Sequence, residues 1–548
     1  IYVGYRYFDT FEVPVRYGFG YGLSYTDFEI TGCALKAVSA EKIRVTATVR
    51  NTGNVSGKEV VQVYASLPGG ILEKEAHRLA AYAKTNELKP GEAQEVTMEV
   101  KMDGLTSYDE KRAAWILESG FYGIWVGNSL ASAKLCGGIK LDQEVIRRQV
   151  RNLFPLKQEL EETSQEASKT AKRAAAAAQQ AKEEELTVLN IRGADIATET
   201  VEYKKNADLY EKEAMDFVNT LSEEDLIDLA AGDPGKAQGG NLGAAGISVP
   251  GSAGETHRCA VDKGLASIVL AGLRLMKYYH VNDGSIVSMP FEFSLEGGLF
   301  YDDSRELPGE RYYQYCTAIP VGTLLAQTWN RELIREVGAM IGTEMEHFGV
   351  TLWLAPGMNI HRNPLCGRNF EYYSEDPYVS GTIAAAMTEG VQSNYGCGTT
   401  IKHFACNNQE DNRMGSDSVV SERALREVYL KGFEIAVKEA QPMSIMTSYN
   451  LINGIHAANN YDLCTESARN EWGFKGAIMT DWTTTEQGDS CTASGCMRAG
   501  NDLVMPGCFG DHDNLRKGLK EGTLKIEDLR ACIARLVSVI WKSNQYLQ

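Results

Sequence analysis

From about residue 245 onward, the sequence repeats one pattern, in which a short apolar run is followed by a stretch with helical period. Apolar runs stand at 350–355, 399–401, 443–446 and 477–479, and residues 421–438 between them carry the 3.6-residue period of an amphipathic helix. Strands that are apolar on both faces are typical of a parallel sheet covered by helices. A region of this length, roughly 300 residues, predicts an (α/β)8 TIM-like barrel over residues 206–548.

The N-terminal part of the chain has a different period. Residues 42–49 alternate between polar and apolar side chains, so that Ile43, Val45, Ala47 and Val49 would share one buried face. Similar short runs follow at intervals, separated by turn signals such as Lys89-Pro90-Gly91. This spacing predicts an all-β sandwich over residues 28–140.

The segment between these two regions favours helix. Residues 159–185 are rich in Ala, Glu, Lys and Gln and contain neither Gly nor Pro. These residue types have high helix propensity. We therefore expect an exposed helical linker over 141–205, with a helix that binds a partner protein as the alternative.

Composition narrows the choice of partner. The 55 basic and 73 acidic residues give a net charge of −18, which argues against nucleic acid or an anionic membrane as a partner. No apolar run is long enough to cross a bilayer. The twelve cysteines include isolated ones such as Cys33 and Cys136, which we interpret as reduced core residues of a cytoplasmic protein.

Polar side chains follow several of the predicted barrel strands directly. Lys402 and His403 come after Ile401, and Asp481 and Trp482 come shortly after Met479. Because barrel strands present their carboxyl ends at one face, these groups are expected to converge. Cations, a carboxylate and an aromatic surface together suit a sugar site. A surface ion pair is the alternative for a single Lys-His pair.

Asp481 is the candidate nucleophile, since an ionised carboxylate can attack an anomeric carbon and be regenerated. Lys402 and Arg368 are expected to keep its pKa low if they converge on it, and a structural helix cap or ion pair is the alternative role. The partner acid stays open, and the carboxyl groups that could serve are Glu371, Glu375, Asp376, Glu410 and Asp411.

Metal and cofactor chemistry find no support in the spacing of candidate ligands. His361, Cys366 and His403 lack the spacing of a metal site, and the glycines at 18, 20 and 22 are not followed by the helix of a dinucleotide site. We therefore expect no metal and no cofactor.

Four ordered motifs of the sequence resemble glycoside hydrolase family 3. The matching segments are Gly367-Arg368-Asn369-Phe370-Glu371 with Ser374-Glu375-Asp376-Pro377, then Lys402-His403-Phe404, then Met446 through Gly454, and finally Glu471 through Trp482. The segments Gly18 through Thr26 and Val60 through Tyr64 are similar to the family's fibronectin-III-like domain. That domain precedes the barrel here, as in the branch of the family with reversed domain order.

The resemblance implies a role for particular residues. Asp481 would be the nucleophile of a retaining, double-displacement β-glucosidase that cleaves terminal β-D-glucosyl residues from small β-glucosides or cello-oligosaccharides. The residues that would bind the substrate sugar are Arg274, Arg368, Lys402, His403, Met446, Tyr449 and Trp482.

Two departures from the family pattern keep alternatives open. Residues 1–27 resemble the tail of an upstream α/β sandwich and its connector, and that sandwich supplies the general acid/base in this branch of the family. The Asp-Gly-Pro that usually precedes the segment matching Gly272-Leu273-Arg274 is absent. The alternatives are a β-xylosidase, a sugar-binding fragment without catalysis, or a chain that needs a separate sandwich-domain chain. A small carbohydrate is the expected substrate, and a homodimer is a further possible assembly.

Overall fold

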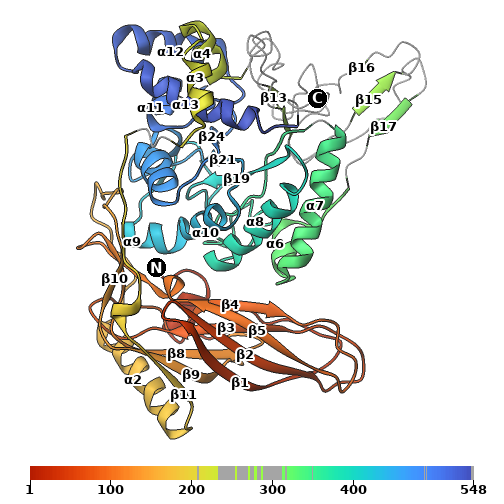
Figure 1. The fold of residues 1–548 in the computed structure, drawn as a ribbon, viewed down its shortest axis with the longest axis vertical. Helices are drawn as coiled ribbons and strands as arrows, with labels where there is room; N and C mark the ends of the chain where they lie inside the picture. Colours follow the sequence, from red (N-terminus) through yellow and green to blue (C-terminus); the bar gives the residue numbers. More distant parts are fainter. Residues whose placement is uncertain are drawn as a thin grey trace.

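The computed structural model describes residues 1–205, 209–232, 317–348, 350–486, 488 and 490–544, and the backbone of five short strands between residues 254 and 314. Arg274 and the junction before Gly272 lie outside the described residues. Figure 1 shows two parts, a β-rich lower part and an upper part built of helices around strands β19, β21 and β24.

The β-rich part is the sandwich predicted from the period-two pattern. A three-stranded antiparallel sheet has the order β1-β2-β5, and a five-stranded sheet has the order β11-β9-β8-β3-β4. Ile43, Val45, Ala47 and Val49 are fully buried, which confirms the predicted face of β2. The strands of both sheets are β1 (Phe28–Ser39), β2 (Lys42–Asn51), β3 (Val60–Ser66), β4 (Arg78–Lys84), β5 (Ala93–Lys101), β8 (Gly120–Gly127), β9 (Lys134–Leu141) and β11 (Thr187–Ile191).

The segment expected to be a helical linker is part of this sandwich. It does contain a helix, α2 (Ala167–Glu183), but its alanines Ala174, Ala177 and Ala181 are buried where α2 packs on β8 and β9 (Figure 1). The same segment adds β11 beside β9 and places β10 (Val145–Gln149) and β12 (Glu199–Thr200) in a sheet with β6 (Ser107–Asp109) and β7 (Ala114–Leu117). The prediction of an exposed linker is therefore wrong, because the small alanine side chains let one face of the helix pack closely against a sheet.

Two cysteines differ from the sequence-based interpretation. Cys33 of β1 and Cys136 of β9 form a disulfide, rather than lying separately as reduced core thiols. The bond joins the two sheets of the sandwich across a sequence separation of 103 residues. The expectation of a cytoplasmic location rested on isolated cysteines, so this pairing removes part of its basis.

The upper part contains a six-stranded sheet of order β13-β14-β18-β19-β21-β24, which is parallel from β14 to β24. Parallel bridges between Met479 and Leu503, and between Ala231 and Val504, continue it beyond β24. The strands are β13 (Gly254–Glu255), β14 (Val269–Ala271), β18 (Leu352–Trp353), β19 (Gly398–Phe404), β21 (Ser444–Thr447) and β24 (Ala477–Met479). The apolar runs at 350–355, 399–401, 443–446 and 477–479 thus contain strands, as predicted.

Helices cover this sheet and the small hairpins beside it. Those named below or in Figure 1 are α1 (Tyr5–Thr10), α3 (Lys212–Val218), α4 (Glu223–Ala230), α6 (Gly322–Ala326), α7 (Arg331–Phe348), α8 (Pro377–Val391), α9 (Glu422–Ala424), α10 (Lys431–Ala440), α11 (Ala493–Ala499), α12 (Phe509–Glu521) and α13 (Ile526–Ile540). The remaining short strands are β15 (Lys277–His280), β16 (Ile286–Val287), β17 (Arg311–Gln314), β20 (Asp417–Ser418), β22 (Leu451–Ile452) and β23 (Ile455–His456).

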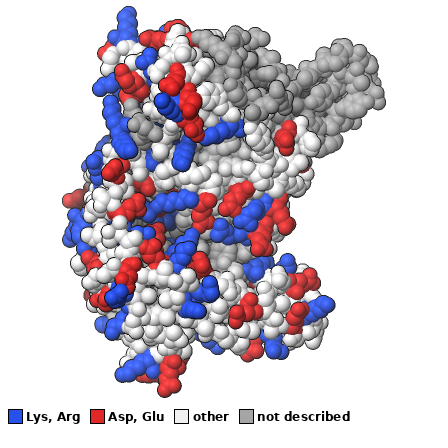
Figure 2. Space-filling view, viewed as in Figure 1, with Lys and Arg blue, Asp and Glu red and all other residues white. Residues whose placement is uncertain are grey.

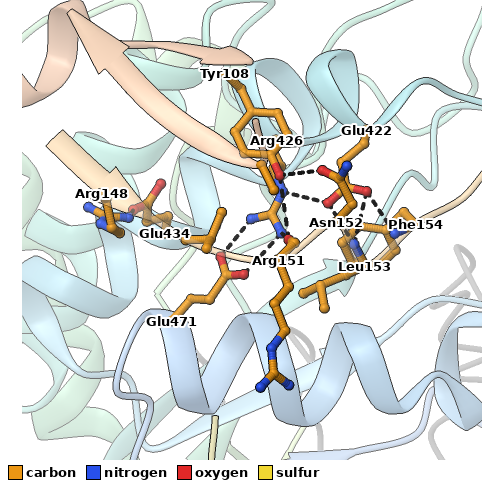
Figure 3. Close-up of polar contacts among 12 residues, drawn as sticks. Tyr108, Arg148, Arg151, Asn152, Leu153, Phe154, Glu422, Arg426, Glu434 and Glu471 are labelled. Atoms are coloured by element: carbon orange, nitrogen blue, oxygen red, sulfur yellow. Dashed lines mark hydrogen bonds and ion pairs between the residues drawn. The ribbon is translucent and has the colours of Figure 1, made fainter. Parts of the chain in front are cut away.

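Buried charges join the two parts of the molecule (Figure 3). The Arg426 guanidinium donates to both carboxylate oxygens of Glu471, at 2.6 and 2.9 Å, and to Oε1 of Glu422 at 2.9 Å. Glu422 in turn accepts hydrogen bonds from the backbone N–H groups of Leu153 and Phe154, which follow β10. Because these carboxylates and the arginine are almost fully buried, the sandwich and the parallel-sheet part share one polar interface.

The surface of the described residues carries both signs of charge. Figure 2 shows Lys and Arg interspersed with Asp and Glu over the visible face. Among the described residues, no helix is both long and apolar enough to cross a membrane.

Candidate active site

The parallel sheet brings the predicted polar residues to one edge. Lys402 and His403 lie at the carboxyl end of strand β19, and Met446 lies in β21. Asp481 follows β24 by two residues. Neighbouring parallel strands end at the same edge of a sheet. This explains why Lys402, Met446 and Asp481, which are far apart in the sequence, come to the same edge. The convergence expected from the sequence is therefore present.

Asp481 is a buried carboxylate that is hydrogen-bonded to the described residues through one oxygen. The residue is 5% exposed, and its Oδ1 accepts a hydrogen bond of 2.8 Å from the backbone N–H of Trp482. Its Oδ2 lies 3.5 Å from Nε2 of His403 and accepts no hydrogen bond from the described residues. A carboxylate held by one oxygen keeps the lone pairs of the other for a reaction partner.

The pKa of Asp481 is raised, whereas the sequence predicted a low pKa. Burial raises the pKa of Asp481 above its usual value, and the cations of Arg368 and Lys402 lower it only in part. Both cations are close enough to lower the pKa of Asp481, although both form ion pairs with Glu371, and desolvation is the larger effect.

Arg368 and Lys402 are held in place by a second carboxylate. Glu371 Oε2 accepts from Arg368 Nε at 2.7 Å and lies 2.6 Å from its Nη2, while Glu371 Oε1 lies 3.3 Å from Lys402 Nζ. Burial raises the pKa of Glu371, but the two cations outweigh it, so that the pKa lies below the usual value. Glu371 therefore stays ionised and does not suit the role of a proton donor.

His403 is buried, neutral and firmly oriented. Burial, with the cations of Arg368 and Lys402 nearby, holds its pKa well below the usual value. Its Nδ1 lies 3.1 Å from the hydroxyl of Tyr372, and its backbone N–H and C=O both pair with the side chain of Asn359, each at 2.8 Å. These contacts leave Nε2 directed toward Asp481.

Tyr449, Trp482 and Met446, the predicted apolar residues of the site, are all buried. The Tyr449 hydroxyl donates to the backbone carbonyl of Trp482 at 2.8 Å. Burial, together with the Asp481 carboxylate, raises the pKa of Tyr449, so the phenol stays protonated. Met446 and Trp482 are buried in the same apolar cluster. Trp482 thus contacts the nucleophile candidate through its backbone and the core through its ring.

The other candidate acids have partners of their own or are exposed, although Glu410 lies close to the site, with its Oε1 4.0 Å from Nε of Arg368. Glu410 Oε2 accepts from Arg413 at 2.8 Å, and Glu375 accepts from the backbone N–H of Tyr5. Asp376 accepts from the N–H groups at the start of α8, and Asp411 is exposed. Among the described residues, we therefore assign none of the five carboxyl groups as the general acid.

Several residues beside Asp481 and His403 were not predicted from the sequence. The Arg413 guanidinium lies over the Tyr449 ring, 4.8 Å from its centroid, and its charge helps to lower the pKa of Asp481. The Tyr372 hydroxyl accepts from Asn407 Nδ2 at 2.8 Å while it contacts His403. These residues lie in loops without strand or helix periodicity, and only their place in the sequence, a few positions after Arg368 or after Lys402-His403, could have indicated them.

Two family profiles match the chain. The fibronectin type III-like domain matches residues 59–130, and the glycosyl hydrolase family 3 N-terminal domain matches residues 304–539. The chain is 36% identical to a β-glucosidase of Ruminococcus albus, over 99% of this chain and 55% of that protein. It is also 36% identical to β-glucosidase A of Butyrivibrio fibrisolvens, over 96% of this chain and 63% of that protein.

Solved structures agree with these matches. A β-glucosidase from Paenibacillus barengoltzii aligns over the whole chain and 59% of its own length, with a TM-score of 0.77 and 31% identity. β-Glucosidase 3B of Thermotoga neapolitana, solved in complex with glucose, aligns over 61% of this chain and 43% of its own, with a TM-score of 0.50 and 40% identity.

The parallel-sheet part and the sandwich before it correspond to the two matched domains of a multidomain protein. The chain belongs to glycoside hydrolase family 3, with the fibronectin-III-like domain ahead of the family's N-terminal domain. The chain spans only 55–63% of the length of the two curated relatives.

Proposed function

We propose that this chain carries the nucleophile and sugar-binding pocket of a retaining β-glucosidase acting on small β-glucosides. The observation that supports it most directly is the Asp481 carboxylate, one oxygen of which accepts no hydrogen bond from the described residues and whose pKa three nearby cations lower. The fold is proposed to be a closed (α/β)8 barrel, because the bridges beyond β24 reach Ala231, before the first strands of the sheet.

In this proposal, Oδ2 of Asp481 attacks the anomeric carbon of the bound glucoside. The bond to the leaving oxygen breaks as the new carbon–oxygen bond forms, and a general acid gives that oxygen a proton. Water then attacks the same carbon and releases glucose, while the acid residue takes the proton from the water. Arg368, Lys402 and neutral His403 would donate hydrogen bonds to the sugar hydroxyls. We propose that the acid comes from an upstream or partner sandwich domain.

The function is tested by covalent trapping. The probe is 2,4-dinitrophenyl 2-deoxy-2-fluoro-β-D-glucoside, whose leaving group departs without a proton, so the test works without the general acid. We expect a label on the tryptic peptide that contains Asp481, detected by mass spectrometry. A folded chain that takes no label from the glucoside or the corresponding xyloside supports the sugar-binding fragment instead. Faster labelling by the xyloside supports the β-xylosidase.

The labelling rate is also expected to report the charge around the nucleophile. In Lys402→Met, one cation that lowers the pKa of Asp481 is removed. Since only the ionised carboxylate attacks, the fall in labelling rate toward acid pH should begin at a higher pH in the variant than in the wild type. The rate is measured from pH 4 to pH 8 by release of dinitrophenolate. Lys438→Met, whose lysine pairs with Glu434 on α10, is the control and should keep the wild-type profile.

A further inference from the structure

The N-terminal helix α1 is attached to the loop that leads from β18 to α8. The backbone N–H of Tyr5 donates to Glu375 Oε1 at 2.8 Å, and the Tyr5 hydroxyl donates to Asp376 Oδ2 at 2.9 Å. The same hydroxyl accepts from the backbone N–H of Leu79 in β4 at 3.0 Å. Tyr5 is 4% exposed and stacks on Phe19. One side chain thus links the sandwich to the end of this loop.

Close packing at Gly4 strengthens the link. Gly4 has a φ of +59°, and a Cβ atom there would lie 2.4 Å from the Glu375 carboxyl carbon. The positive φ favours glycine at this position, and a side chain there would displace the Glu375 carboxylate. The chain therefore passes directly against the Glu375 carboxylate before Tyr5 binds it.

The attached loop carries a large part of the sugar-binding pocket. It closes on itself where the N–H of His361 donates to the carbonyl of Ser374, next to Glu375. Between these two points lie Arg368, which pairs with Glu371 and contacts the Tyr372 ring, and Tyr372 itself, which contacts His403.

The loop has a second anchor on α6. The Thr323 hydroxyl lies within hydrogen-bond distance of the backbone carbonyl oxygens of Asn369, at 2.7 Å, and Tyr372, at 2.9 Å. This anchor holds the middle of the loop, whereas Tyr5 holds its end, three residues after Tyr372. With both in place, the loop is fixed on either side of the Tyr372–His403 contact.

We propose that Tyr5 is a positioning residue for sugar binding, which acts by fixing the β18–α8 loop so that Arg368 and Tyr372 keep their places beside His403. This inference rests on the proposed function, because it takes Arg368 and His403 to bind the sugar. It gives the N-terminal segment and the sandwich a direct role in the pocket, in addition to their role in stability.

The test is the variant Tyr5→Phe, which removes one hydroxyl and keeps the ring that stacks on Phe19. The matched control is Tyr82→Phe, since the Tyr82 hydroxyl also crosses from the sandwich to the other part, but to Thr382 within α8 at 2.8 Å. Labelling by the fluoroglucoside gives two constants, the probe concentration at half-maximal rate and the maximal rate. We expect Tyr5→Phe to raise the first by roughly three- to tenfold and Tyr82→Phe to leave it unchanged.

A double-variant cycle separates positioning from general destabilisation. If Tyr5 acts through Arg368, then Tyr5→Phe should add almost nothing to the binding defect of Arg368→Lys. Fully additive effects, or equal effects in Tyr5→Phe and Tyr82→Phe, would overturn the inference.

If Tyr5→Phe does not fold, Glu375→Ala removes the hydrogen bond from the backbone N–H of Tyr5 and should give the same loss of binding. Wild-type chain that takes no label overturns the proposed function itself, whereas normal labelling with an unaffected Tyr5→Phe overturns only the inference.

Discussion

Asp481→Asn is expected to lose covalent labelling almost completely while the protein stays folded. The amide nitrogen and oxygen fill the space of the carboxylate, but an amide is a very weak nucleophile, so the labelling rate should fall by at least roughly 10³-fold. The measurement is dinitrophenolate release together with the mass of the intact protein. Asp411→Asn, which changes an exposed carboxylate in the neighbouring loop, is the control and should label at the wild-type rate.

The same variant is expected to be slightly more stable than the wild type at neutral pH. Burial raises the pKa of Asp481 in the folded state, so the ionised carboxylate is less favourable there than in the unfolded chain. The contribution of this group to stability is therefore most favourable below the unfolded pKa, and it declines as the pH rises through the folded pKa. Removing the charge relieves that penalty at pH 7. A large drop in the melting temperature of Asp481→Asn, with or without residual labelling, would contradict this account of the site.

Much of the site could be predicted from where the polar residues stand. Lys402, His403 and Asp481 directly follow apolar runs, and parallel strands bring such positions to one edge whatever the detailed packing. The role of Glu371 could not be predicted in the same way. By residue type it was one of five possible proton donors, and only the distances to Arg368 and Lys402 identify it as their counter-ion.

The parts of the fold that were missed depend on contacts distant in sequence. Residues 145–149 include two arginines and lack a clear period, because Arg148 is buried against Glu434 of the other part at 2.8 Å (Figure 3). A buried ion pair replaces the apolar side chain that a strand pattern would show. The Cys33–Cys136 disulfide likewise joins strands of two different sheets, β1 and β9, which come together only when the sheets pack on each other.

Arg426→Met is expected to destabilise the whole chain more than any surface change. The substitution leaves the carboxylates of Glu422 and Glu471 buried without their cation, and breaking a buried pair in this way typically costs about 3–5 kcal/mol. The change in the free energy of unfolding is measured by denaturant unfolding followed by far-UV circular dichroism. The control is Arg335→Met, whose partly exposed pair with Glu389 should contribute less than about 1 kcal/mol.

The shape of the unfolding curve tests what this interface does. Arg426 also donates to the backbone carbonyl of Arg151, and its guanidinium lies over the ring of Tyr108. If these contacts make the sandwich and the parallel-sheet part unfold together, the wild type should show one transition and Arg426→Met two. The double variant Arg426→Met, Glu471→Met should recover part of the lost free energy of unfolding, because it removes one of the two buried carboxylates that have no cation in Arg426→Met. A single transition in Arg426→Met at the wild-type midpoint would mean that apolar packing alone joins the two parts.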